Sequence, residues 1–93
     1  MKTLHTINKT GQPFDNCLRS VAEGDTILLI EDGIYGLLVG KRQLETIRST
    51  CKLIAMNQDL KARGINAPDD CLAINYEQFV KQSLEHDKVI SWF

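Results

Sequence analysis

The sequence predicts an α/β fold: a small, doubly wound, mostly parallel sheet of five strands with helices on both faces. Two observations carry this prediction. Apolar runs at residues 26–30 and 52–56 each end abruptly in polar residues that are typical of a helix start. Both runs are apolar at consecutive positions, as expected of strands whose two faces are covered by helices. With 93 residues, the chain is expected to form one domain over residues 1–93.

The first strand and helix are expected near the N-terminus. Residues 2–7 are short, rich in Thr and Ile, and predict a strand. Pro13 suits the first turn of the helix that follows, and Gly24 is expected to cap its end. Apolar residues recur in this helix at i, i+3, i+4 and i+7, the stripe of an amphipathic helix. They are Phe14, Cys17, Leu18 and Val21.

Two further helices are expected between the second and third strands. Asp32 can cap a short helix that ends at Gly40, and residues 43–49 predict another helix. The second and third strands are the two apolar runs already described. Together these elements give two strand-helix units before position 60.

The second half of the chain continues the alternation. Asn57 is expected to cap a helix that Gly64 ends, and Asn75 with Gln78 forms a capping box for the last helix. The last two strands are expected at residues 71–74 and 88–92. One face of the last helix is expected to carry Tyr76, Phe79, Val80, Ser83 and Leu84.

Composition limits the possible functions. Eleven basic residues against twelve acidic ones argue against a dedicated nucleic-acid or membrane surface. No apolar stretch approaches the ~20 residues of a membrane span, and the N-terminus turns polar at once. We therefore expect a cytoplasmic location, without a membrane anchor or a signal peptide. Three cysteines without a C-x-x-C pair make a disulfide framework or a zinc site unexpected.

A nucleotide site is also unexpected. In nucleotide-binding folds of this class a glycine-rich loop follows the first strand, where backbone N–H groups can approach phosphates. Residues 8–13 hold a single glycine and a proline, and neither G-x-G-x-x-G nor the P-loop pattern occurs. The sequence therefore implies no cofactor and no metal.

Few other side chains could carry chemistry. His5 lies near the carboxyl end of the first strand and has either a structural hydrogen-bonding role or a role in a cleft. His86 follows the last helix and is expected to interact with its end. Asp32 stands after a central strand, where it could act as a general base or simply cap a helix.

The cysteines matter most, because a thiolate could accept or pass sulfur as a persulfide. Cys51 and Cys71 stand at the amino ends of strands, away from the expected site, and are expected to be core or edge residues. Cys17 lies on the apolar stripe of the first helix, where burial would raise its pKa and block access. Cys17 is therefore a weak catalytic candidate, and no other cysteine is one.

Several strings in order resemble the TusB/DsrH family. They are residues 4–9 (LHTINK), 29–36 (LIEDGIYG), 59–64 (DLKARG), 74–80 (INYEQFV) and Trp92 near the end. The resemblance spans nearly the whole chain. It implies a small DsrE-like, flavodoxin-like fold and a role as one of three homologous subunits of a sulfur-relay complex, a heterotrimer that pairs into a heterohexamer.

In such relays, persulfide sulfur passes from a carrier protein through the complex to an acceptor protein. The resemblance places the principal persulfide cysteine in a larger sister subunit, so this chain would be non-catalytic and not an enzyme by itself. The Tus branch ends in 2-thiolation of the tRNA wobble uridine, without direct nucleic-acid contact by this chain. One alternative is a DsrH-type subunit of dissimilatory sulfur oxidation, because DsrH-type members carry a cysteine at the point matching Cys17. Another is a stand-alone small-ligand binding domain.

Independently of the resemblance, some apolar residues exceed what one helix face needs. Candidates for a subunit interface are Ile34, Tyr35, Leu37, Leu38, Trp92 and Phe93. The alternative is that all of them pack inside the domain.

Overall fold

The computed structural model describes residues 1–93, and its five strands form one sheet. They are β1 (Thr3–Ile7), β2 (Thr26–Leu29), β3 (Lys52–Met56), β4 (Leu72–Ile74) and β5 (Lys88–Trp92). The strand order is β4-β3-β2-β1-β5, and every neighbouring pair is parallel. The α/β prediction is confirmed, with a sheet that is wholly rather than mostly parallel.

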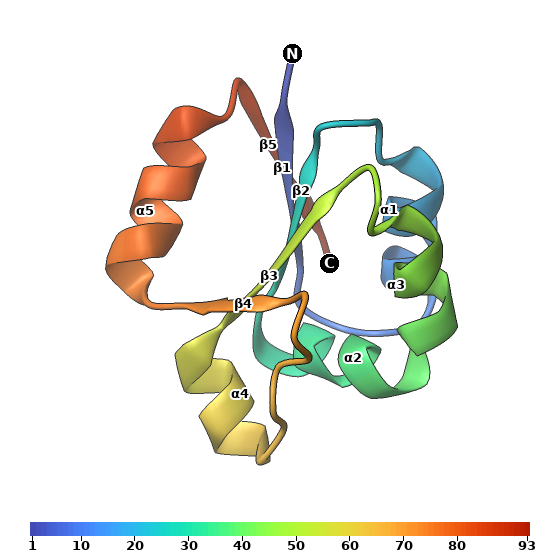
Figure 1. Ribbon diagram of the computed structural model, residues 1–93, viewed down its shortest axis with the longest axis vertical. Coiled ribbons are helices and arrows are strands. Elements are labelled where there is room, and N and C mark those ends of the chain that lie inside the picture. Colours follow the sequence, from blue (N-terminus) through green and yellow to red (C-terminus); the bar gives the residue numbers. More distant parts are fainter.

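Helices cover both faces of the sheet. They are α1 (Gln12–Ser20), the 3-10 helix η1 (Glu31–Tyr35), α2 (Gly36–Val39), α3 (Lys41–Ile47), α4 (Asn57–Arg63) and α5 (Tyr76–Glu85). Figure 1 shows α1 and α3 on one face, α5 alone on the other, and α2 and α4 beyond the carboxyl ends of the strands. None of these helices is long and apolar enough to cross a membrane.

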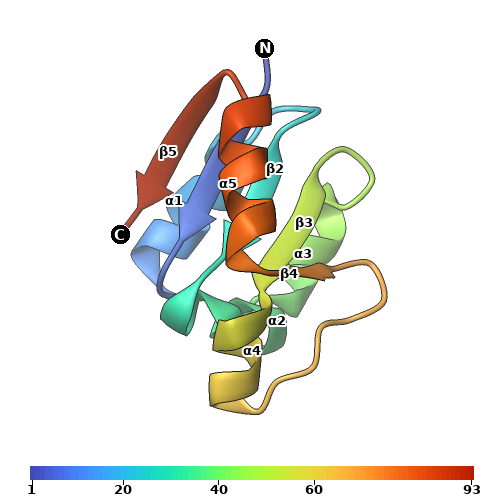
Figure 2. The same ribbon diagram turned by 90° about the vertical axis from the view of Figure 1, so that its left-hand side faces the viewer.

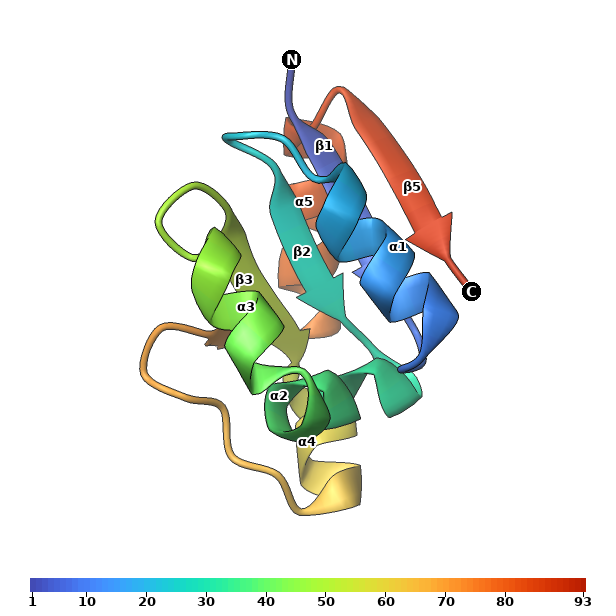
Figure 3. The same cartoon turned by 90° about the vertical axis from the view of Figure 1, so that its right-hand side faces the viewer.

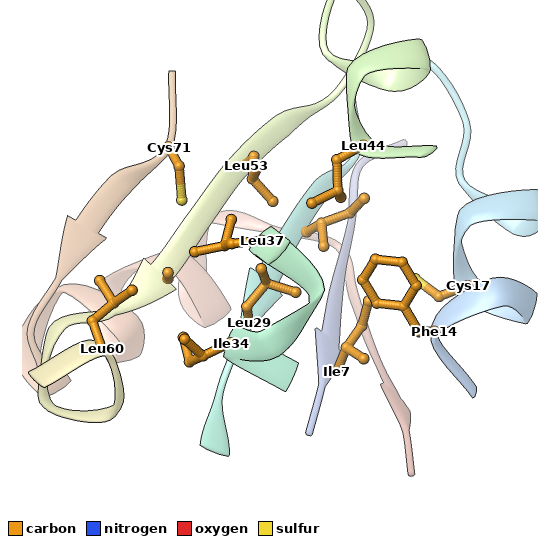
Figure 4. Close-up of a cluster of buried hydrophobic side chains, with 12 residues drawn as sticks. Ile7, Phe14, Cys17, Leu29, Ile34, Leu37, Leu44, Leu53, Leu60 and Cys71 are labelled. Carbon is orange, nitrogen blue, oxygen red and sulfur yellow. The ribbon is translucent and has the colours of Figure 1, made fainter. Parts of the chain in front are cut away.

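The core has two layers, one on each side of the sheet. Twelve buried residues pack between the sheet and the helices α1 to α4 (Figure 4), and five more lie on the face covered by α5. In β2, Ile27 and Leu29 belong to the first layer and Leu28 to the second. A strand that is buried on both faces requires apolar residues at consecutive positions, which is the pattern seen in the sequence.

Phe14 locks α1 to α2. Its ring lies directly against the backbone at Gly36 and Gly40, where the Cβ of any other residue would collide with it. The two glycines stand one helical turn apart, so α2 presents a flat strip to the ring. The apolar stripe of α1 is therefore confirmed at Phe14 and Cys17, which are both buried.

Several predicted helix ends were wrong. Helix α1 ends at Ser20 because Val21 is already extended, and Gly24 instead turns the chain into β2 with φ 90°. Neither Asp32 nor Asn57 caps a helix: Asp32 lies inside η1, Asn57 is the first residue of α4, and neither helix has a side-chain cap. The capping box at the start of α5 is confirmed.

Helix α5 uses only part of its apolar face. Phe79 packs against the five buried residues on this face of the sheet, whereas Tyr76, Val80 and Leu84 remain exposed. Figure 2 shows this single helix lying across the sheet. A five-stranded sheet is about 20 Å wide and a helix about 10 Å, so one helix leaves much of the face uncovered.

Candidate functional site

The carboxyl ends of the strands, where open α/β sheets bind ligands, are closed by helices (Figure 1). Gly33 of η1 packs so closely on β1 that an added Cβ would collide with the carbonyl oxygen of Ile7. Glu31 adopts φ 48°, and its N–H donates to Asp59 Oδ2 at 2.9 Å. This turn therefore serves to seat η1 between β1 and α4.

Asp32 forms an ion pair at this edge. Its Oδ1 accepts from Arg63 Nε at 3.0 Å and from Arg63 Nη2 at 2.9 Å. The same guanidinium lies 3.7 Å from Asp59 Oδ1 and 5.9 Å from the ring centroid of Tyr35. Asp32 thus ties η1 to α4 at the surface, which matches neither the predicted cap nor the position of a free general base.

His5 is buried and fully hydrogen-bonded. Trp92 Nε1–H donates to His5 Nδ1 at 3.0 Å, so the neutral ring carries its proton on Nε2, which donates to Asp25 Oδ2 at 2.8 Å. Both ring nitrogens are occupied by protein partners. The geometry fits the structural alternative for His5 and leaves no ring nitrogen for a substrate.

Asp25 completes this buried network and was missed in the sequence. Besides the bond from His5, its carboxylate accepts the N–H groups of Thr3 at 3.1 Å and Ala22 at 3.0 Å. Burial alone would raise the pKa of Asp25, but these hydrogen bonds outweigh it and lower the pKa below its ordinary value. Asp25 follows Glu23 and Gly24 in a polar turn, and nothing in that pattern marks it as buried.

His86 behaves as a helix-end residue, as predicted. Its Nδ1–H donates to the carbonyl of Gln82 at 2.6 Å, one of the free carbonyls at the end of α5. Its Nε2 accepts from the hydroxyl of Thr26 at 2.8 Å. The side chain therefore anchors the end of α5 to β2.

All three thiols are buried. Cys17 is fully enclosed, and burial, reinforced by the nearby Cys51 and Asp25, raises its pKa to about 12. Burial also raises the pKa of Cys71 to about 11, although Arg48 opposes the shift. Figure 4 shows Cys17 on α1 behind the ring of Phe14, and Cys71 beside β4 at the other end of the cluster. Neither thiol is a nucleophile at neutral pH without an opening of the core.

The structure separates the six interface candidates into three groups by exposure. Ile34 and Leu37 are buried in the domain's own core, and Leu37 also lines a surface cavity. Trp92 is partly buried and is held by its bond to His5. Tyr35, Leu38 and Phe93 are 40%, 61% and 62% exposed and remain available to a partner.

No group of three or more His, Cys, Asp or Glu side chains could hold a metal ion. The edge of the sheet holds ion pairs and closely packed backbone, and the thiols lie inside. Of the residues singled out in the sequence, none combines exposure with a reactive state.

Comparisons with known proteins agree with this reading of the fold. The model of the family described as "DsrH like protein" matches residues 10–89. Proteins named "Protein TusB" from Escherichia coli O81 and from Shigella boydii serotype 18 are 35% identical over 96% of this chain and 99% of their own length. The crystal structure of the ychN protein from E. coli shares the fold, with a TM-score of 0.77 at 17% identity over 98% of this chain and 99% of that one. The chain therefore belongs to the TusB/DsrH family.

Proposed function

We propose that the chain is a non-catalytic subunit of a cytoplasmic persulfide sulfur-relay complex that supports 2-thiolation of the tRNA wobble uridine. Membership of the TusB/DsrH family supports a role in a sulfur relay, and one observation of the structure supports the non-catalytic role. Cys17 is fully enclosed and its pKa is about 12. A thiol in that state has almost no thiolate at neutral pH and no path for a persulfide donor.

The proposed partners are two homologous subunits, in a heterotrimer that pairs into a heterohexamer. A sister subunit supplies the reactive cysteine, and a sulfur carrier and an acceptor protein dock on the assembly. Exposed apolar residues such as Leu38 and Val39 support a role in assembly. The near-neutral net charge of −1 supports contact with proteins rather than direct contact with RNA.

The rival function is a DsrH-type subunit in which Cys17 itself carries sulfur. It rests on the presence of a cysteine in α1. For Cys17 to react, α1 would have to move off the sheet, breaking the contacts of Phe14 with Gly36 and Gly40. The enclosed thiol therefore favours the non-catalytic role.

The test is sulfur transfer by the assembled complex with Cys17 replaced. We expect the Cys17→Ala complex, purified with both sister subunits, to transfer sulfur from the carrier at a rate within about twofold of the unaltered complex. Cys17→Ser places a hydroxyl in the core and serves as a second variant, with circular dichroism to verify folding. Loss of transfer in an intact Cys17→Ala complex would instead support the rival.

A further inference from the structure

A surface cavity of about 310 Å³ lies between α3 and the segment that joins α4 to β4. Its apolar lining is formed by Leu37, Leu38, Leu44 and Leu53, of which Figure 4 labels Leu37, Leu44 and Leu53. Figure 3 shows why the space exists: α3 lies over the sheet on this side, whereas the chain from α4 to β4 returns as an extended loop rather than a helix. The cavity belongs to neither the thiols nor the ion pairs described above.

Two cationic side chains and one carboxylate line the cavity. The Arg48 guanidinium forms an ion pair with Asp70 through Nη2, but its Nε is buried without any hydrogen-bond partner. Lys41, on the same helix, also lines the cavity and is exposed. Two cations against one carboxylate leave the lining with one net positive charge. An occupant that satisfies this lining brings a carboxylate together with an apolar group.

The apolar surface extends beyond the cavity. Leu38 lines it and is 61% exposed, and the next residue, Val39, is 75% exposed. A small molecule held inside the cavity would leave Val39 in water. A protein surface would fill the cavity and cover both side chains at once, in the way that buried anchor residues and their surroundings do at stable interfaces.

We propose that this cavity, here called the α3 socket, receives an apolar side chain with an adjacent carboxylate from a homologous sister subunit. The proposal rests on the proposed function and names the surface through which the relay complex assembles. The apolar group fills the space lined by Leu37 and Leu53. The carboxylate accepts from Lys41 Nζ, which offsets the net positive charge of the lining.

Two pairs of matched variants test the socket. Lys41→Glu and Arg42→Glu reverse neighbouring exposed cations of α3, but only Lys41 lines the cavity, whereas Arg42 faces the groove beside α1. Leu38→Glu and Leu84→Glu place a charge at exposed leucines of two different helices, α2 and α5. Affinity for the purified pair of sister subunits is measured by titration calorimetry, after circular dichroism has verified that each variant is folded.

We expect Lys41→Glu and Leu38→Glu to weaken association at least about tenfold, and Arg42→Glu and Leu84→Glu to stay within about twofold of the unaltered chain. Binding of Lys41→Glu and Leu38→Glu as tight as that of the unaltered chain would overturn the socket. So would selective loss with Leu84→Glu, which would place the interface on α5.

Two further outcomes are distinguishable from these. If the unaltered chain does not bind the sister pair, the proposed function fails before the socket is tested. If the complex tolerates both socket variants, while phenylacetate alone saturably shifts the backbone amide signals of Leu37 and Leu53, the cavity is a small-molecule site and the socket is overturned.

Discussion

The enclosed thiol of Cys17 makes a quantitative prediction about alkylation. At pH 8, a thiol with the ordinary pKa of 9.0 is about one-tenth ionised, whereas a thiol with a pKa of about 12 is ionised in about one molecule in 10,000. The thiolate fraction therefore falls about 1000-fold. Complete burial lowers the rate further, because iodoacetamide cannot reach the sulfur without an opening of the core.

The assay compares Cys17 with itself. Native protein and unfolded protein are both alkylated with iodoacetamide at pH 8. The unfolded sample is kept in about 6 M guanidinium chloride, which is enough to unfold small domains. Labelling of the peptide that contains Cys17 is followed by mass spectrometry. We expect native labelling to be at least about 1000-fold slower than labelling of the unfolded chain. A native rate within about tenfold of the unfolded rate would refute the argument that burial silences this thiol.

Three further predictions concern stability and are checked by urea unfolding. Gly33→Ala should lower the free energy of unfolding by about 3 kcal/mol or more, because the new Cβ collides with the backbone carbonyl of Ile7. Gly64→Ala, at φ 63° but in open space, should lower it by about 1 kcal/mol. Equal losses would contradict the close approach of Gly33 to Ile7. Asp25→Asn should cost about 1 to 3 kcal/mol at pH 7. Folding lowers the pKa of Asp25, so the stabilisation from its carboxylate is present above the unfolded value of 3.8 and is lost as the pH falls through the folded pKa. The difference in free energy of unfolding between Asp25→Asn and the unaltered chain should therefore shrink at pH 3. A difference that stays constant would contradict an ionised Asp25. Asn75→Ala should cost about 1 kcal/mol by removing the capping box, and no change would mean that α5 does not depend on it.

Most of the fold could be predicted because local patterns and tertiary packing agree. The consecutive apolar residues of β2 are buried on both faces, and the stripe of α1 faces the sheet at Phe14 and Cys17. Asn75 and Gln78 lie three positions apart, which is all that a capping box requires. Gly64 ends α4 in the left-handed conformation that glycine adopts without cost.

Helix ends that depend on distant partners could not be predicted. Asp32 has the residue type of a cap, but Arg63, which is 31 positions away, holds its carboxylate instead. The end of α1 is set by Asp25, whose carboxylate accepts the N–H of Ala22 and so stabilises the turn after Val21. Contacts of this kind depend on how the strands align, which no local pattern contains.

Exposure within an apolar run was also beyond the sequence. Leu37 and Leu38 are adjacent and chemically identical, yet one is 7% and the other 61% exposed. This difference in exposure follows from the packing of Phe14 on Gly36 and Gly40, which fixes the rotation of α2 about its axis. The α3 socket likewise arises from an extended loop that meets a helix far away in the chain.

The central claim is that this subunit contributes surface and shape while a sister subunit carries the sulfur. It is tested most directly by following labelled persulfide sulfur through the reconstituted complex during turnover, with rapid quenching and mass spectrometry of every cysteine. The account predicts label on a sister subunit at the rate of transfer and none on Cys17, Cys51 or Cys71. Label that arrives on Cys17 and leaves it at the turnover rate would contradict it.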